Sequence, residues 1–84
     1  MKATTVTPKD MRPEDGANFN ASIEKHDGAW KAAWWRSLPV GGTLFEEKPA
    51  TGVFGPEAAA LAWIRRQANA LGFKEILWPQ DHKA

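Results

Sequence analysis

The sequence lacks the residues on which several kinds of functional site depend. It contains no cysteine, which excludes disulfides, thiolate metal sites and a thiol nucleophile. Its two histidines, His26 and His82, lie far apart in the chain, so no paired-histidine metal motif is present. No apolar run is long enough to span a membrane, and the N-terminal stretch lacks the apolar core of a secretory signal. These absences predict no metal, no cofactor, no membrane contact and a cytoplasmic location.

Catalytic arrangements are missing as well. The serines, Ser22 and Ser37, do not lie in the G-x-S-x-G context of a nucleophile elbow. The adjacent carboxylates of Glu46 and Glu47 would face opposite sides of a strand, so they cannot act together on one bond. The sequence therefore predicts no catalytic residue, and we expect a protein that is not an enzyme.

Large aromatic residues are what the chain has in abundance. Five tryptophans and four phenylalanines among 84 residues supply enough apolar surface for one small domain to build a core. Residues 1–18 contain two prolines and few sizeable apolar side chains, which predicts a flexible N-terminal arm. We therefore expect this arm, a single α+β domain over residues 19–79, and a C-terminal tail over residues 80–84.

The strongest local signal is the Asp27-Gly28 pair, which favours a two-residue hairpin turn. Pairing outward from this turn sorts the flanking side chains onto two faces of a sheet. The apolar face consists of Phe19, Ala21, Ile23, Trp30, Ala32 and Trp34. The mostly polar face consists of Asn20, Ser22, Glu24, His26, Lys31 and Trp35. This separation indicates a half-buried sheet, although residues 29–38 also fit an amphipathic helix with Asp27 as its N-cap.

Three further segments follow this hairpin. We predict a loop over residues 37–42, a third strand over residues 43–48 and a turn-rich connection over residues 49–55. The glycines and prolines of the first and last of these segments are the basis for both loop predictions.

A helix is the best-bounded element of the sequence. It is predicted over residues 56–71, because Pro56 suits the first helical position and Gly72 suits the C-cap. Residues 73–78 then indicate a final strand. The predicted fold is a small two-layer α+β domain, with an antiparallel sheet in the order β-β-β-α-β and one main helix packed on one face.

Aromatic residues beside basic ones are the candidates for a binding site. Trp35 stays off the apolar face in both interpretations of its segment, and Lys31 and Arg36 lie near it in the chain. An exposed tryptophan is a typical anchor for a protein partner or for stacked bases. Packing of Trp35 beneath the arm, the loop or a second layer is the structural alternative. A second candidate set consists of Trp63, Arg65 and Arg66 on the predicted helix, whose alternative interpretation is a solvated basic face.

Two stretches carry a resemblance to a known family. The stretch IEKHDGAWKA indicates a strand, a turn with glycine and a tryptophan strand, and VFGPEAAALAWI is similar to a helix entry of the form F-x-T-x-x-x-A-x-x-W. Over residues 23–71 they resemble the N-terminal arm-type DNA-binding domains of phage tyrosine integrases, which implies a sheet that binds DNA. In size and layout the chain is also similar to small phage proteins that inhibit host defences, including anti-CRISPR proteins. That similarity implies binding to a host protein without catalysis.

The charge balance decides which class of partner we expect. Eleven basic and ten acidic residues give a net charge of +1, whereas domains that bind nucleic acid through phosphates usually have a clear basic excess. We expect a small non-enzymatic binding module, a protein-binding inhibitor or adaptor of phage or mobile-element type. The alternative is a DNA- or RNA-binding domain with an exposed sheet face. A contiguous basic face would favour nucleic acid, and a mixed-charge face around a tryptophan would favour protein.

Overall fold

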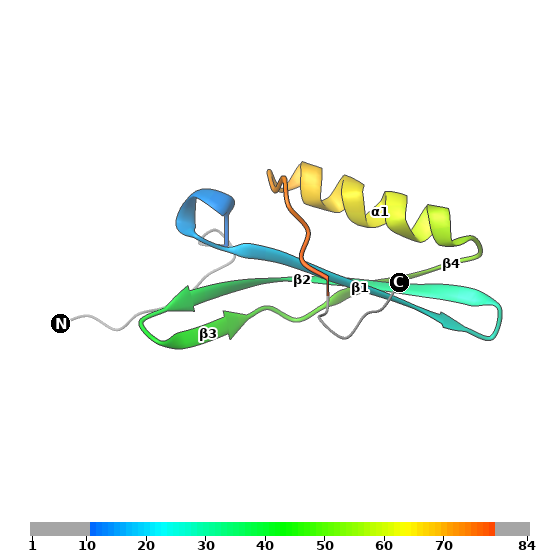
Figure 1. Ribbon diagram of the computed structural model, residues 1–84, viewed down its shortest axis with the longest axis horizontal. Coiled ribbons are helices and arrows are strands. Elements are labelled where there is room, and N and C mark those ends of the chain that lie inside the picture. Colours follow the sequence, from blue (N-terminus) through cyan, green and yellow to red (C-terminus); the bar gives the residue numbers. More distant parts are fainter. Residues whose placement is uncertain (1–10, 79–84) are drawn as a thin grey trace.

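The computed structural model describes residues 11–78. Its architecture has two layers, an antiparallel sheet and one helix that lies over one face of that sheet (Figure 1). The elements are β1 (Asn18–His26), β2 (Ala29–Val40), β3 (Thr43–Glu46), β4 (Ala50–Phe54) and α1 (Glu57–Ala70), with a short 3-10 turn, Pro13–Asp15, before β1. The predicted fold class, a small two-layer α+β domain, is confirmed.

The β1–β2 hairpin has the register that the sequence predicts. His26 pairs with Ala29 on either side of the turn, and the pairing continues outward without a bulge. Asp27 and Gly28 both have positive φ, of 51° and 78°, which is the combination that a type I′ turn requires. The apolar and polar faces of the hairpin are therefore those predicted, and the helical interpretation of residues 29–38 is wrong.

β2 is the central strand, and one of its edges is shared by two short strands. β3 pairs with residues 37–40 of β2, and β4 pairs with residues 30–34 along the same edge. Both run antiparallel to β2, so they lie end to end like one strand that is interrupted at residues 47–49 (Figure 1). The sheet is therefore a three-stranded meander with a gap in its third strand.

The loop predicted over residues 37–42 is wrong for most of its length. β2 continues to Val40, and only the following two glycines form a turn. Pro39 is tolerated in this strand because alternation directs its nitrogen toward the β1 side, where pairing with β1 has already ended at Ser37. No ladder hydrogen bond is therefore lost at the proline.

The strands further along the chain also differ from the prediction. The connection expected over residues 49–55 contains β4, because pairing with β2 outweighs the turn-forming tendency of its glycine and of the prolines nearby. The strand expected over residues 73–78 is reduced to one parallel bridge, between Leu77 and Asn20 of β1. The order of elements is thus β-β-β-β-α rather than β-β-β-α-β.

The third strand and the helix are confirmed with small changes in their bounds. β3 stops at Glu46, before the predicted end of that strand at residue 48. α1 lies within the predicted range, and Gly72 has the positive φ of 86° expected just beyond a helix C-terminus. The buried residues of α1 are Ala60, Ile64 and Ala68. Because two of them are small, the helix packs closely on the sheet.

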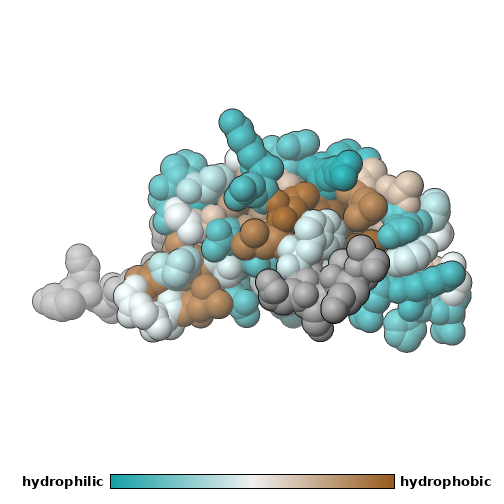
Figure 2. Space-filling view, viewed as in Figure 1, coloured by the Kyte–Doolittle hydropathy of each residue, from teal (hydrophilic) through white to brown (hydrophobic). Residues whose placement is uncertain are grey.

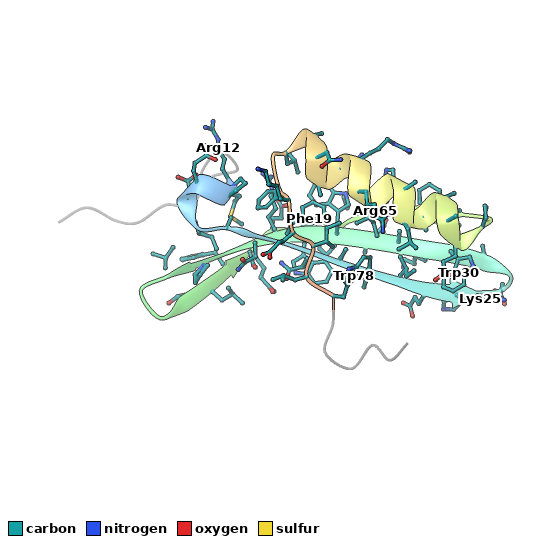
Figure 3. The ribbon with its side chains drawn as sticks, turned by 45° about the horizontal axis from the view of Figure 1, so that its top comes forward. Arg12, Phe19, Lys25, Trp30, Arg65 and Trp78 are labelled. Carbon is teal, nitrogen blue, oxygen red and sulfur yellow. The ribbon has the colours of Figure 1, made fainter. Side chains whose placement is uncertain are left out.

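The core lies between α1 and the sheet, and aromatic rings fill much of it. Phe19 of β1 is 1% exposed; its ring stacks on Trp34 with 5.1 Å between centroids and packs against Phe73 at 5.6 Å (Figure 3). Further along the sheet, Phe54 packs against Trp63 with 5.4 Å between centroids. Such pairs contribute about 0.5–1.5 kcal/mol each beyond their burial.

The described part of the predicted N-terminal arm packs on this core. Met11 and Ala17 are both buried, and the Met11 carbonyl accepts a hydrogen bond from Arg36 at 3.2 Å. Residues 1–10 of the arm, and residues 79–84 with the predicted tail, lie outside the described residues.

Candidate functional site

The two faces of the sheet differ in what covers them. α1 contacts β1, β2 and β4 on the face that carries the buried apolar residues. No helix or strand within residues 11–78 covers the opposite face, which we name the open face (Figure 1). The strand register places on it Asn18, Asn20, Ser22, Glu24, His26, Ala29, Lys31, Ala33, Trp35, Ser37, Pro39, Leu44, Glu46, Thr51 and Val53, and the bridge to Asn20 adds Leu77.

Trp35 occupies the middle of the open face. It is half-buried, and it lies opposite Asn20 on one side and opposite the interruption of the third strand on the other. The Asn20 side-chain amide donates to the Trp35 carbonyl at 3.2 Å and to the hydroxyl of Ser37 at 3.0 Å. These bonds hold the backbone around the tryptophan in one arrangement. The predicted placement of Trp35 away from the apolar face is confirmed.

Exposed apolar side chains flank Trp35 on the open face. Val53 is 68% exposed, Leu44 is 57% exposed and Leu77 is 44% exposed. Pairing places Val53 beside Lys31 and Leu44 beside Pro39. Because Lys31 and Pro39 are both on β2, the two apolar side chains are about 27 Å apart along that strand. Figure 2 shows hydrophobic residues gathered at the end of the molecule that the β2–β3 hairpin forms.

These three apolar residues were not identified from the sequence. Val53 would have been found by alternation once residues 50–54 were recognised as a strand, because it then shares a face with Lys31. Leu77 gave no local signal, since its place depends on a bridge to a strand far away in the chain.

The charge on the open face is mixed. Glu24 lies directly opposite Lys31, and Glu46 lies at the end of β3 opposite Ser37. Among the strand residues of this face that the structure describes, one lysine therefore stands against two glutamates. A contiguous basic surface, which binding through phosphates requires, is not formed there.

Arg36 lies on the covered face, and its guanidinium is engaged within the fold. Its Nε donates to Oε2 of Glu47 at 2.8 Å and its Nη2 donates to Oε1 at 2.9 Å, so the pair is bidentate. The backbone N–H of Arg36 donates to the same Oε2 at 2.9 Å. With the bond to Met11 included, this arginine ties the arm and the third strand to β2. The structure thus separates Arg36 from Trp35 and Lys31, with which the sequence grouped it.

The second predicted set lies on α1 and is not joined to the open face. Trp63 is half-buried and packs against Phe54, so it belongs to the contact between helix and sheet. Arg65 and Arg66 are exposed, and neither forms a salt bridge within the described residues. The binding roles of these three residues stay predictions.

Other classes of site were searched for within residues 11–78. In that range no group of three or more metal-ligating side chains is arranged to hold an ion. None of its helices is long and apolar enough to cross a membrane.

Comparison with known proteins found no relative: no protein-family model, curated protein or solved structure matches the chain. The resemblances to the arm-type domains of phage integrases and to anti-CRISPR proteins therefore stay predictions.

Proposed function

We propose that this chain is a non-enzymatic protein-binding module, an adaptor or inhibitor that contacts its partner through the open face. The observation that carries the proposal is the half-buried Trp35 in the middle of the open face, with single exposed apolar side chains, Val53, Leu44 and Leu77, spaced on either side of it. A tryptophan surrounded by polar residues on an uncovered sheet face is a typical anchor of binding energy.

The rim of the open face favours a protein over a nucleic acid. β1 contributes only polar side chains to this face, namely Asn18, Asn20, Ser22, Glu24 and His26. Amide, hydroxyl and carboxylate groups at the edge of an apolar centre are the usual composition of a protein–protein interface. The two glutamates of the face would repel phosphates, whereas they can pair with basic side chains of a protein.

The expected partner surface follows from this arrangement. It presents an apolar group to the area around Trp35 and Val53, and a basic group to Glu24 or Glu46. We expect the interface to use the rigid strands as they stand, because the hairpin register and the Asn20 bonds already fix the backbone there.

The proposal is tested with variants of Val53, the most exposed of these apolar residues. Wild-type chain and the Val53→Asp variant are immobilised side by side and exposed to a lysate of the native host. Proteins that only the wild type retains are purified and titrated against each variant by calorimetry. We expect Trp35→Ala and Val53→Asp to weaken binding about tenfold or more, because the first removes the central anchor and the second places a charge at an apolar contact beside it.

Two matched controls make the result specific. Val53→Thr keeps the β-branched shape and replaces one methyl group by a hydroxyl, so we expect it to bind within about threefold of wild type. Arg66→Gln alters the exposed side of α1 and should leave the affinity unchanged. Recovery of nucleic acid alone, with steep salt dependence, or equal loss in Arg66→Gln and Val53→Asp would overturn the proposal.

A further inference from the structure

A small hollow lies on the helix side of the molecule, between α1 and the segment that follows it. Its volume is about 210 Å³, and it is lined by Arg65, Ala68, Asn69, Phe73, Lys74 and Ile76. Arg65 and Asn69 are one turn apart on the same side of α1, and Lys74 comes from the chain that descends to the sheet. In Figure 3 Arg65 lies on α1, away from the end of the sheet that carries Trp30 and Lys25.

The polar side chains of the lining, those of Arg65, Asn69 and Lys74, can all donate hydrogen bonds. Arg65 and Lys74 are cations, and none of the residues within 11–78 that line the hollow is acidic. Within residues 11–78, none of these three side chains forms a salt bridge or a side-chain hydrogen bond. An anion in the hollow would therefore meet donors that residues 11–78 leave unused.

The floor of the hollow is apolar. Its accessible apolar surface comes from Ile76, which is half-buried, because Ala68 and Phe73 are only 1% and 5% exposed. A hydrated inorganic anion gains nothing from such a floor, whereas a short aliphatic stem does. The volume is below the range of about 300–1,000 Å³ that is typical of pockets for larger ligands, so the occupant is the size of a side chain or a small acid.

Backbone carbonyls at the nearby C-terminus of α1 are already hydrogen-bonded. The carbonyls of Gln67, Ala68 and Asn69 accept hydrogen bonds from the N–H groups of residues 71–73, which close the helix end. The negative end of the helix dipole is thereby partly satisfied, and Arg65 and Lys74, which line the hollow, are exposed.

We propose that this hollow binds a carboxylate carried on a short apolar stem, with Arg65 and Lys74 pairing with the carboxylate and Ile76 contacting the stem. Arginine presents a planar pair of donors that matches a carboxylate, and Asn69 supplies one more donor at the rim. The group comes either from a free short-chain acid or from a glutamate side chain of a protein. The site does not depend on the open face, so either proposal stands if the other fails.

The test is a titration of the isotope-labelled full chain followed by NMR. The probes are butyrate, acetate, inorganic phosphate and a blocked peptide with one glutamate. We expect butyrate to shift the Asn69 side-chain amide and the Arg65 Hε signals with millimolar saturation. A methylene that Ile76 covers should tighten binding up to about fourfold, so butyrate should bind more tightly than acetate.

Variants at exposed positions separate the site from general attraction to a basic surface. Arg65→Gln and Lys74→Gln should each weaken butyrate binding about three- to fivefold. Arg66→Gln is the matched control, because Arg66 is the neighbouring exposed arginine and does not line the hollow. Tighter binding of the glutamate peptide than of butyrate assigns a protein source, and the reverse assigns a free acid. Tighter binding of phosphate, or an equal effect of Arg66→Gln, overturns the proposal.

Discussion

The covered face and the open face are built from the same strands but differ in how their apolar side chains are packed. On the covered face the rings of Phe19 and Trp34 stack, and α1 places small residues against them. On the open face the strands present single apolar side chains, such as Val53 and Leu44, separated by polar ones. The first arrangement stabilises the fold through continuous packing. The second leaves apolar area for a partner at little cost to the fold, so stability and binding can be altered separately.

Truncating a large apolar residue on each face should have the most different effects on the free energy of unfolding. Phe19→Ala removes a ring that is 1% exposed and contacts Trp34 and Phe73, so we expect a loss of about 3–5 kcal/mol in the free energy of unfolding. Leu44→Ala, at a residue that is 57% exposed on the open face, should change it by less than about 0.5 kcal/mol. Urea denaturation followed by tryptophan fluorescence measures both. Equal losses would show that the two faces are packed alike.

A second pair of variants compares acidic residues across the two faces. Glu47→Gln keeps the shape of the side chain but removes the charge that Arg36 pairs with, on side chains that are 12% and 22% exposed. We expect a loss of about 1.5–3 kcal/mol, because hydrogen bonds to charged groups are among the stronger ones.

The control is Glu24→Gln on the open face, where the carboxylate lies exposed beside Lys31. Exposed pairs of this kind contribute little, so we expect a change within about 0.5 kcal/mol. Both are measured by thermal unfolding at the same ionic strength. A loss at residue 47 no larger than at residue 24 would contradict a structural role for the Arg36 pair.

A third pair of variants adds side-chain atoms on each face and tests how tightly that face is packed. A Cβ at Gly52 would lie 3.0 Å from the Phe54 ring and 3.5 Å from Trp63, so Gly52→Val should destabilise the fold by about 1–2 kcal/mol. Thr51→Val, one residue away on the open face, adds no such contact and should stay within about 0.5 kcal/mol. Differential scanning calorimetry distinguishes them. Tolerance of Gly52→Val would show that the ring contact over residue 52 is loose.

The hairpin could be predicted because two independent signals agree. The Asp27-Gly28 pair fits a type I′ turn, and the register that it imposes separates apolar from polar side chains. Neither signal depends on residues far away in the chain. The placement of Trp35 on the polar face follows from the same register, so this part of the candidate site was also predictable.

The strands that were missed depend on pairing rather than on local sequence. Residues 50–54 contain a glycine and lie between prolines, so their local signals indicate turns, yet the free edge of β2 orders them as a strand. The segment 73–78 has the composition of a strand, but it must first cross from the helix layer to the edge of β1. Only Leu77 reaches pairing distance, and the proline at position 79 has no N–H to extend the ladder.

Arg36 shows the same limit for the candidate site. In the chain it adjoins Trp35, and the sequence contains no local sign of its partner. The pair with Glu47 forms because the third strand breaks at that point and turns a carboxylate toward the Arg36 N–H in place of a backbone carbonyl. This replacement of a backbone carbonyl by a carboxylate depends on the tertiary arrangement. Sequence patterns therefore cannot reveal which arginine is paired within the fold and which is free to bind a partner.

The interruption of the third strand gives the chain a place where its length can change without disturbing either end. The position of β3 is set by the turn at Gly41 and Gly42, and the position of β4 is set by its own pairs with β2 and by α1. A residue added at Lys48 would therefore lengthen the bend and leave both strand registers as they are. The same addition at the β1–β2 turn would exchange the two faces of β1. The β2–β3 hairpin and the part of the sheet that α1 covers can thus change separately during evolution, because residues 47–49 join them.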